Sequence, residues 1–311
     1  MKQPHLSGFV SIVGRPNAGK STLMNALLDT KIAIVADKPQ TTRHIIQGVY
    51  TDPGAQIVLL DTPGILDPKN RLHHRMNERV KEALQGRELI LFCVDASRPF
   101  QPEDEAAISW INGLKTPVFL VFTKIDLLER KSDLLPIIDA YRSKHEFSEI
   151  IPVSSKKGDG IIRLRRAILA KMPKGPRYFP EDYITNQPER FLAAELIREQ
   201  ILNLTHREVP HSVAVFIDKW EEVERKEGGM LTRIMATIHV ERPGHKGIII
   251  GRGGEMMKKI GTAARMEMEK ILDRKIFLEV FVKVSEEWRE KEEFLNELDA
   301  SAKSSAAPEP Q

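Results

Sequence analysis

The sequence contains very few cysteine and aromatic residues. It has one cysteine, Cys93, and three tryptophans among 311 residues, and aromatic residues make up 6% of the chain. A single cysteine excludes an intramolecular disulfide and the cysteine cluster of a structural zinc site. Cys93 lies in the apolar run 89–94, so we expect a reduced, packed thiol and a reducing, intracellular compartment.

Long apolar runs and a strong excess of one charge are also absent. No apolar run approaches the ~18 residues of a membrane-spanning helix, and the first residues lack the apolar stretch of a signal peptide. We therefore expect a cytoplasmic protein, with peripheral contact at the inner face of the cell membrane as the alternative. The formal charge of +3 is too small to identify a nucleic-acid-binding protein, so any basic surface must be local.

Short apolar runs alternate with stretches of helical periodicity between residues 9 and 153. The expected strands are 9–13, 45–50, 57–60, 89–94, 118–122 and 150–153, and the expected helices are 70–84, 103–114, 133–141 and 161–172. This alternation predicts an α/β domain with a mostly parallel sheet and helices on both faces. The proline-rich segment 172–180 interrupts the pattern, so we assign residues 1–175 to the first domain.

The second half of the chain follows a different order. We expect helices at 189–204 and from about 255 to 272, and strands at 213–217, 233–240 and 276–284. This order predicts a smaller α+β domain over residues 176–299 that ends in a partly docked helix between 286 and 299. Residues 300–311 should form a disordered tail, and we expect a monomer.

The segment from Gly14 to Ser21 has the pattern G-x-x-x-x-G-K-S directly after an expected strand. Its glycines allow backbone N–H groups to converge on phosphate oxygens at the start of a helix. Lys20 would contact the outer phosphates, and the Ser21 hydroxyl would bind Mg²⁺. An accidental glycine turn is the alternative. The predicted phosphate-binding residues are Asn17, Ala18, Gly19, Lys20, Ser21 and Thr22.

Two later segments predict that the base is guanine. Asp126, in Thr123-Lys124-Ile125-Asp126, can accept hydrogen bonds from guanine N1 and N2, a donor pair that adenine lacks. After the last expected strand, backbone N–H groups of Ser154, Ser155 and Lys156 can reach guanine O6. Each segment alone is a weak signal, but their order and their positions at strand ends make the set strong.

Two segments between these motifs predict a site for the γ-phosphate and its magnesium ion. Asp61 can hold Mg²⁺ through water, and Gly64 can donate its N–H to the γ-phosphate. Thr42, which we favour over Thr41, supplies a second hydroxyl for Mg²⁺, although a surface turn is the alternative. We therefore assign catalysis to Lys20, Thr42 and Gly64, without a general base.

The sixth motif is Gly251-Arg252-Gly253-Gly254, a G-x-x-G turn that can grip about four nucleotides of RNA backbone. Arg252 and Lys258 would contact phosphates. Ile248, Ile249 and Ile260 should form the apolar floor of that site or the domain core, and we favour the core. A structural turn is the alternative for the motif itself.

With these motifs in this order, the chain resembles the Era GTPases over about residues 6–295. The resemblance implies a P-loop, Ras-like domain that binds GTP and GDP, followed by a type II KH domain. It also implies binding to the 3′ end of small-subunit ribosomal RNA and assistance in assembly of the small ribosomal subunit.

Four positions qualify this resemblance. Ile65 stands where Ras-like enzymes place a water-orienting glutamine, so intrinsic hydrolysis should be slow. Asn17 matches the position through which related GTPases use K⁺, a second candidate cofactor. Thr123 replaces the usual asparagine, so we expect weaker or water-mediated bonds to guanine N7 and to the phosphate loop. Ser155 replaces alanine with little consequence.

Two other functions remain open at this point. In the first, the chain is an RNA chaperone that uses GTP only as an ordering ligand, which the apolar Ile65 keeps plausible. In the second, it is a membrane-surface signalling GTPase whose second domain meets anionic lipid.

Overall fold

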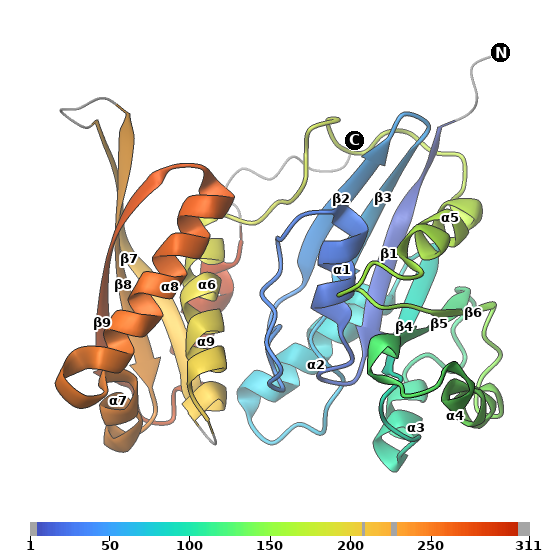
Figure 1. The fold of residues 1–311 in the computed structure, drawn as a ribbon, viewed down its shortest axis with the longest axis horizontal. Helices are drawn as coiled ribbons and strands as arrows, with labels where there is room; N and C mark the ends of the chain where they lie inside the picture. Colours follow the sequence, from blue (N-terminus) through green and yellow to red (C-terminus); the bar gives the residue numbers. More distant parts are fainter. Residues whose placement is uncertain (1–4, 207–208, 225–228, 304–311) are drawn as a thin grey trace.

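The computed structural model describes residues 5–206, 209–224 and 229–303. Its first sheet has the strand order β2-β3-β1-β4-β5-β6, in which only β2 is antiparallel to its neighbour (Figure 1). The strands are β1 (Leu6–Gly14), β2 (Ile46–Asp52), β3 (Ala55–Asp61), β4 (Leu89–Asp95), β5 (Val118–Thr123) and β6 (Glu149–Pro152). The mostly parallel sheet predicted from the sequence is confirmed.

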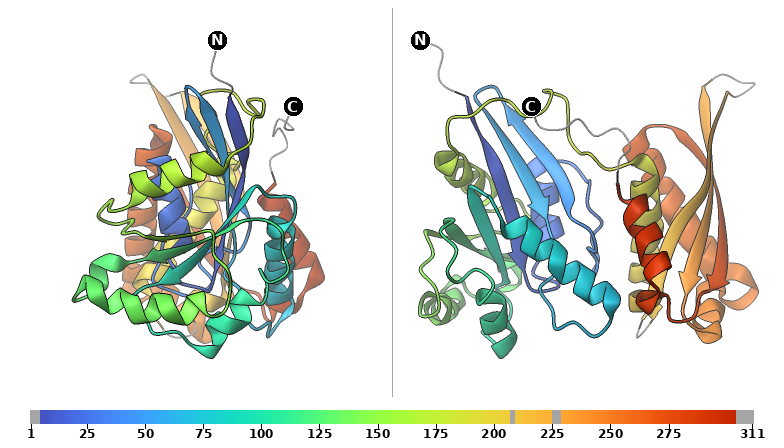
Figure 2. Two further views of the ribbon diagram at one scale, coloured as in Figure 1. Left: turned by 90° about the vertical axis from the view of Figure 1, so that its right-hand side faces the viewer. Right: turned by 180° about the vertical axis from the view of Figure 1, so that it is seen from behind.

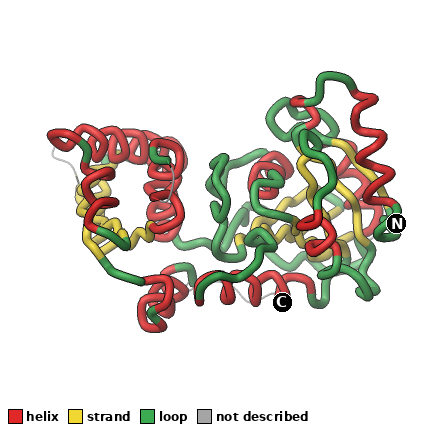
Figure 3. Tube along the Cα trace, turned by 90° about the horizontal axis from the view of Figure 1, so that it is seen from below, coloured by secondary structure: helices red, strands yellow, loops and turns green. Residues whose placement is uncertain are grey.

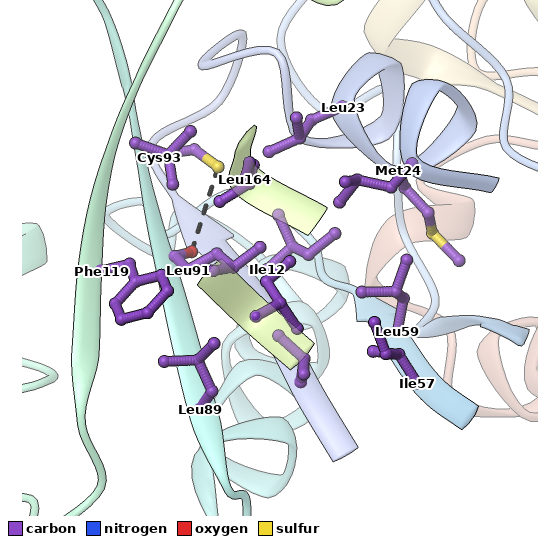
Figure 4. Close-up of a cluster of buried hydrophobic side chains, with 14 of the residues drawn as sticks. Ile12, Leu23, Met24, Ile57, Leu59, Leu89, Leu91, Cys93, Phe119 and Leu164 are labelled. Atoms are coloured by element: carbon purple, nitrogen blue, oxygen red, sulfur yellow. Dashed lines mark hydrogen bonds between the residues drawn. The ribbon is translucent and has the colours of Figure 1, made fainter. Parts of the chain in front are cut away.

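Helices cover both faces of this sheet because the central strands are apolar on both sides. On one face lie α1 (Lys20–Leu28) and α5 (Ile161–Lys171), and on the other lie α2 (Arg71–Leu84), α3 (Pro102–Ile108) and α4 (Leu134–Arg142). Figure 4 shows the first core, in which Leu23 and Leu164 pack against Ile12 and the buried, free Cys93.

One helix of the first domain is shorter than expected. The pattern predicts a helix to residue 114, but α3 ends at Ile108. The segment that follows contains Ser109, Asn112 and Gly113, which favour turns, and Gly113 adopts a φ of +82°. A left-handed residue cannot continue a right-handed helix, so the chain turns here before entering β5.

The second domain has a three-stranded sheet in which β7 (Val213–Glu224) is antiparallel to β8 (Met230–Val240) and β8 is parallel to β9 (Lys275–Val284). Helices α6 (Glu189–Leu204), α7 (Pro243–Ile250) and α8 (Glu255–Leu272) pack on one face, and α9 (Glu292–Ser301) packs on the other (Figure 2). The part of the chain that the structure describes also contains five short 3₁₀ segments: Ile125–Leu127, Lys131–Asp133, Val209–Ser212, Arg252–Gly254 and Trp288–Glu290.

Three expectations for the second domain need correction. Strand β7 continues past Ile217 to Glu224 after a bulge, and its exposed charged residues hid this extension from an apolar pattern. Helix α7 was not expected, and it begins at Pro243, a residue suited to a first helical turn. Helix α9 includes Ala300 and Ser301, which we assigned to a tail, and residues 304–311 lie outside the described part of the chain.

The proline-rich connection lies along the first sheet before it reaches the second domain. Pro173 accepts a hydrogen bond from Ser7, the Gln56 amide binds the carbonyl of Phe179 at 3.0 Å, and Thr185 pairs with Gly48. Residues 173–185 therefore contact the first sheet on both sides of the boundary that we placed at residue 175. That boundary stays a prediction.

Within the described ranges, no helix has both the length and the apolar composition needed to cross a membrane.

Candidate functional site

A pocket of about 380 Å³ lies at the carboxyl ends of β1 and β3, where α1 begins. The G-x-x-x-x-G-K-S loop forms one wall, and residues 34–42 with Gly64 form the other. Gly14 and Gly19 have φ values of +144° and +77°, which side chains rarely adopt, so the loop requires both glycines. The residues of this loop that line the pocket are Pro16, Asn17, Gly19, Lys20, Ser21 and Thr22.

Lys20 is the buried cation of this pocket. Its ammonium donates to the carbonyl oxygens of Gly14 at 3.2 Å and Arg15 at 2.9 Å, and the side chain is 6% exposed. Burial lowers the pKa of Lys20, although the charge of Asp61 opposes the shift. The ammonium therefore lies on the floor of a pocket whose backbone N–H groups favour anions.

Ser21, Thr42 and Asp61 come together although they are far apart in the sequence. Ser21 Oγ donates to Asp61 Oδ2 at 2.6 Å and lies 2.8 Å from Thr42 Oγ1, which is 3.3 Å from the same carboxylate oxygen. Thr41 instead bonds the carbonyl of Lys38 at 2.7 Å, so the geometry favours Thr42.

This cluster fits a hard cation. Asp61 is fully buried, its Oδ1 has no hydrogen-bond partner, and burial raises its pKa to about 6 despite the nearby charge of Lys20. A buried carboxylate with a free oxygen beside two hydroxyls is the donor set that Mg²⁺ prefers.

Gly64 and Ile65 contribute no reactive side chain to the other wall. A Cβ at Gly64 would lie 2.5 Å from the Pro16 nitrogen, so only glycine fits against the phosphate-binding loop. Ile65 is 7% exposed and packs into the core, and its N–H donates to Gly14 O at 3.1 Å. The side chain at position 65 therefore does not reach a nucleophilic water.

The predicted base-binding residues meet at the ends of β5 and β6. Asp126 Oδ1 accepts a hydrogen bond from Ser154 Oγ at 2.6 Å, and Lys124 Nζ pairs with Asp95 at 2.8 Å. Ser155 and Lys156 follow directly in the same loop. Thr123 Oγ1 donates to Ala18 O at 2.8 Å, so the tie to the phosphate-binding loop is direct, which corrects the water-mediated alternative. That this tie is weaker than one made by asparagine stays a prediction.

The second glycine motif forms the turn between α7 and α8. Gly251, Gly253 and Gly254 all have positive φ values, of 72°, 57° and 83°, and Arg252 and Lys258 are exposed near them. Ile248 is 49% exposed, which corrects our placement of this side chain in the core. Ile249 and Ile260 are completely buried, as expected. The turn therefore presents backbone, two cations and one apolar side chain.

Comparisons with known proteins agree with both motifs. A family model described as a 50S ribosome-binding GTPase matches residues 9–124, and a KH domain model matches residues 208–289. The chain is 49% identical over 295 residues to a GTPase Era from Geobacter metallireducens, covering 95% of this chain and 98% of the relative. A GTPase Era from Clostridioides difficile is 49% identical over 290 residues, covering 93% and 97%. The chain belongs to the Era family of GTPases.

Two solved structures of Era proteins have the same architecture. One is a crystal structure of Era in complex with MgGDPNP and nucleotides 1506–1542 of 16S ribosomal RNA, with a TM-score of 0.91 and 42% identity. The other is a single-residue variant of Aquifex aeolicus Era bound to GDP.AlF4-, with a TM-score of 0.89 and 42% identity. Each match covers 96% of this chain and 99% of the other. The expected Ras-like domain followed by a type II KH domain is confirmed.

The sequence did not reveal that the loop between α1 and β2 contacts the KH domain. Arg43, 2% exposed, donates to Val213 O at 2.7 Å and to His211 O at 3.4 Å. From α6, Arg198 donates to Thr41 O, and Glu199 Oε1 accepts from Val35 N at 2.8 Å. Seen from below, loops of the first domain face the second domain (Figure 3). In the sequence, Arg43 was distinguished only by its position next to Thr42, and no pattern pointed to a contact with the KH domain.

A second contact joins α2 and α9. Asp299 pairs with Arg79, with Arg75 at 2.7 Å and with His44 Nε2 at 3.3 Å. Burial opposes ionisation of Asp299, but the bond to His44 and the charge of Arg79 outweigh it and lower the pKa of Asp299 to about 2. Beside the ion pairs with Arg75 and Arg79, the two helices make an apolar contact formed by Leu72, Met76, Leu295 and Leu298.

Proposed function

We propose that the chain binds GTP and Mg²⁺ in the pocket above α1, hydrolyses GTP, and holds small-subunit ribosomal RNA on its KH turn to assist assembly of the small ribosomal subunit. One observation carries this proposal. Thr42 lies in the magnesium cluster, while Arg43, the next residue, is buried against the KH domain. A change at the γ-phosphate therefore reaches the RNA-binding domain through a single peptide bond.

The chemical step is attack of water on the γ-phosphate. Lys20 would hold the outer phosphate oxygens, and the Gly64 N–H would stabilise charge that develops on the γ-phosphate. Ser21 and Thr42 would bind magnesium directly and Asp61 through water, and the ion would supply positive charge to the phosphates. No general base is assigned, because Ile65 is buried in the core.

Family membership supports GTP turnover over a role for GTP as an ordering ligand alone.

The same proposal includes potassium as an activating ion. Asn17 lines the pocket beside Lys20 and has a left-handed φ of 64°, a conformation that asparagine tolerates better than most residues. Its side-chain carbonyl offers an oxygen ligand close to the phosphates, where a monovalent cation would offset charge that develops during hydrolysis.

RNA would bind at the turn between α7 and α8. Gly251, Gly253 and Gly254 allow close approach of an RNA backbone, and Arg252 and Lys258 offer cations to its phosphates. The solved Era structure that contains nucleotides of 16S ribosomal RNA supports this choice of partner. Such a partner supports a location in the cytoplasm, and we propose that the chain acts as a monomer.

RNA retention tests this proposal. We would measure binding of an oligonucleotide from the 3′ end of small-subunit ribosomal RNA to the full chain, with GDP and with a non-hydrolysable GTP analogue. Gly253→Asp should abolish binding, because it places an anion in the turn without a steric clash. Gly229→Asp is the matched control, since this glycine also has a positive φ and open space around it.

Equal RNA binding by both variants and the wild type would contradict the RNA site. Sedimentation of the wild-type chain with vesicles that contain anionic lipid, without RNA retention, would instead favour the membrane-surface alternative. Identical RNA affinity in the two nucleotide states would contradict the coupling between the domains.

A further inference from the structure

We infer that this chain recognises guanine without donating a hydrogen bond to the purine N7. Thr123 is the residue that sets this property. The inference rests on the proposed binding of GTP and concerns how the base is recognised. Guanine presents donors at N1 and N2 and acceptors at O6 and N7, so each of these atoms needs a partner on the protein or in water.

The Thr123 hydroxyl is used within the protein. It lies 2.8 Å from Ala18 O and 3.0 Å from Val94 O, both of which are acceptors. A hydroxyl has one hydrogen, so bonding to either carbonyl leaves nothing to donate to a base.

Thr123 is also covered by the phosphate-binding loop. Only 1% of the residue is exposed. A Cβ built on Gly19 would lie 3.2 Å from Thr123 Oγ1, so this oxygen lies directly against the loop backbone. A base placed beyond the loop therefore meets almost no surface of Thr123.

Two neighbouring side chains of the base-binding region have other partners. Lys124 pairs its ammonium with Asp95 at the end of β4, at 2.8 Å. Ser154 donates its hydroxyl to Asp126 at 2.6 Å. Asp126 is an acceptor and matches N1 and N2, not N7. The purine is therefore recognised at its Watson–Crick edge, and N7 keeps water as its partner.

Asparagine at this position would behave differently. Its amide group has two hydrogens on one nitrogen. One hydrogen can replace the bond to Ala18 O, and the other is free to reach N7. Asparagine and threonine are close in size, so the exchange does not require the loop to move. The Thr123→Asn variant should gain a contact that the wild type lacks.

Titration with GTP and 7-deaza-GTP tests this inference, because the analogue replaces N7 with a C–H group and keeps the Watson–Crick edge. The wild type should bind the two with dissociation constants equal within about twofold. Thr123→Asn should prefer GTP by roughly two- to tenfold, the usual value of one hydrogen bond. Thr123→Ser is the matched control, because it keeps a single hydroxyl hydrogen and should not distinguish the two nucleotides.

A preference of the wild type for GTP well beyond twofold would overturn the inference, since another donor must then reach N7. The inference would also fail if Thr123→Asn bound GTP but bound 7-deaza-GTP with the same affinity. Failure of the proposed function gives a different result: neither nucleotide binds, or ATP binds as tightly as GTP. The wild-type ratio decides the question even if the asparagine variant does not fold.

Discussion

The guanidinium carbon of Arg43 lies 5.4 Å from the centre of the Trp288 ring. Trp288 is completely buried and donates its indole N–H to Ser212 O at 3.0 Å, so its position within the KH domain is fixed. Burial and the charges of Arg198 and other cations lower the pKa of Arg43. Burying the charge of Arg43 is energetically unfavourable, and this charge lies directly beside Thr42. Its position therefore suits a residue that couples the two domains.

Arg43→Lys should separate nucleotide binding from RNA binding. Lysine keeps the charge but lacks the planar fork that contacts Val213 and His211. The affinity for GTP should stay within about threefold, while the RNA affinity should no longer depend on the nucleotide state. RNA titrations with GDP and with the GTP analogue measure this, and the exposed Arg142→Lys is the control. A dependence as large as in the wild type would contradict the coupling role.

Lys20→Ala should remove GTP binding or turnover. The substitution deletes the only ammonium that we place at the outer phosphates, and a charged hydrogen bond contributes about 1.5–3 kcal/mol, or roughly 10- to 150-fold in affinity. Calorimetry with the GTP analogue and a phosphate-release assay measure the effect. The exposed Lys131→Ala should behave like the wild type. Normal activity in Lys20→Ala would eliminate the proposed site.

Asp61→Asn should have opposite effects with and without Mg²⁺ and GTP. The folded pKa of Asp61, about 6, exceeds the ordinary value near 3.9, so folding favours the protonated acid. The contribution of protonated Asp61 to the free energy of unfolding is complete below pH ~4 and is lost as the pH rises through ~6. Without ligands above pH 6, the asparagine variant should therefore gain roughly 1–3 kcal/mol in unfolding free energy relative to the wild type.

Thermal unfolding at pH 4 and pH 7.5 measures this difference, which should shrink at the lower pH. With Mg²⁺ and the GTP analogue the order should reverse, because only the wild type has the carboxylate for the cation. Mg²⁺ binding to the wild type should weaken below pH 6 for the same reason. Equal Mg²⁺-dependent stabilisation of both proteins would contradict the assignment of Asp61.

Ser154→Ala should weaken the preference for guanine. The Ser154 hydroxyl holds Asp126 at 2.6 Å, and its loss frees the carboxylate to rotate. We expect GTP affinity to fall by roughly two- to tenfold, with little change for ATP. Ser155→Ala is the matched control, since only its backbone is assigned to the base. Competition binding with both triphosphates gives the ratio, and an unchanged ratio in Ser154→Ala would count against this orientation.

Potassium should accelerate hydrolysis more than sodium. Asn17→Gly removes the side-chain carbonyl and still allows the φ of 64°, so it should abolish the difference while the loop keeps its shape. Single-turnover phosphate release in matched K⁺ and Na⁺ buffers measures this. Equal rates for the wild type in the two buffers would reject potassium activation.

Each part of the predicted nucleotide site is a short segment at a strand end, and the structure brings these segments together. Parallel strands bring such ends together whatever the intervening loops contain, so Lys20 and Asp126 could be assigned from position alone. No comparable rule predicts from the sequence which residues of the two domains contact each other. Arg43 meets Val213 across 170 residues, and nothing in either local pattern marks the pair. Helix α7 was missed because its eight residues include two glycines and a proline.

The ion pair between Arg75 and Asp299 joins residues that are 224 positions apart, and Asp299 lies near the end of the described chain. Domains made early in synthesis fold before the rest of a chain has left the ribosome. The nucleotide-binding part can therefore fold while α9 is still being translated. The helix that joins the two halves of the molecule therefore becomes available only after the strands of both sheets have been made.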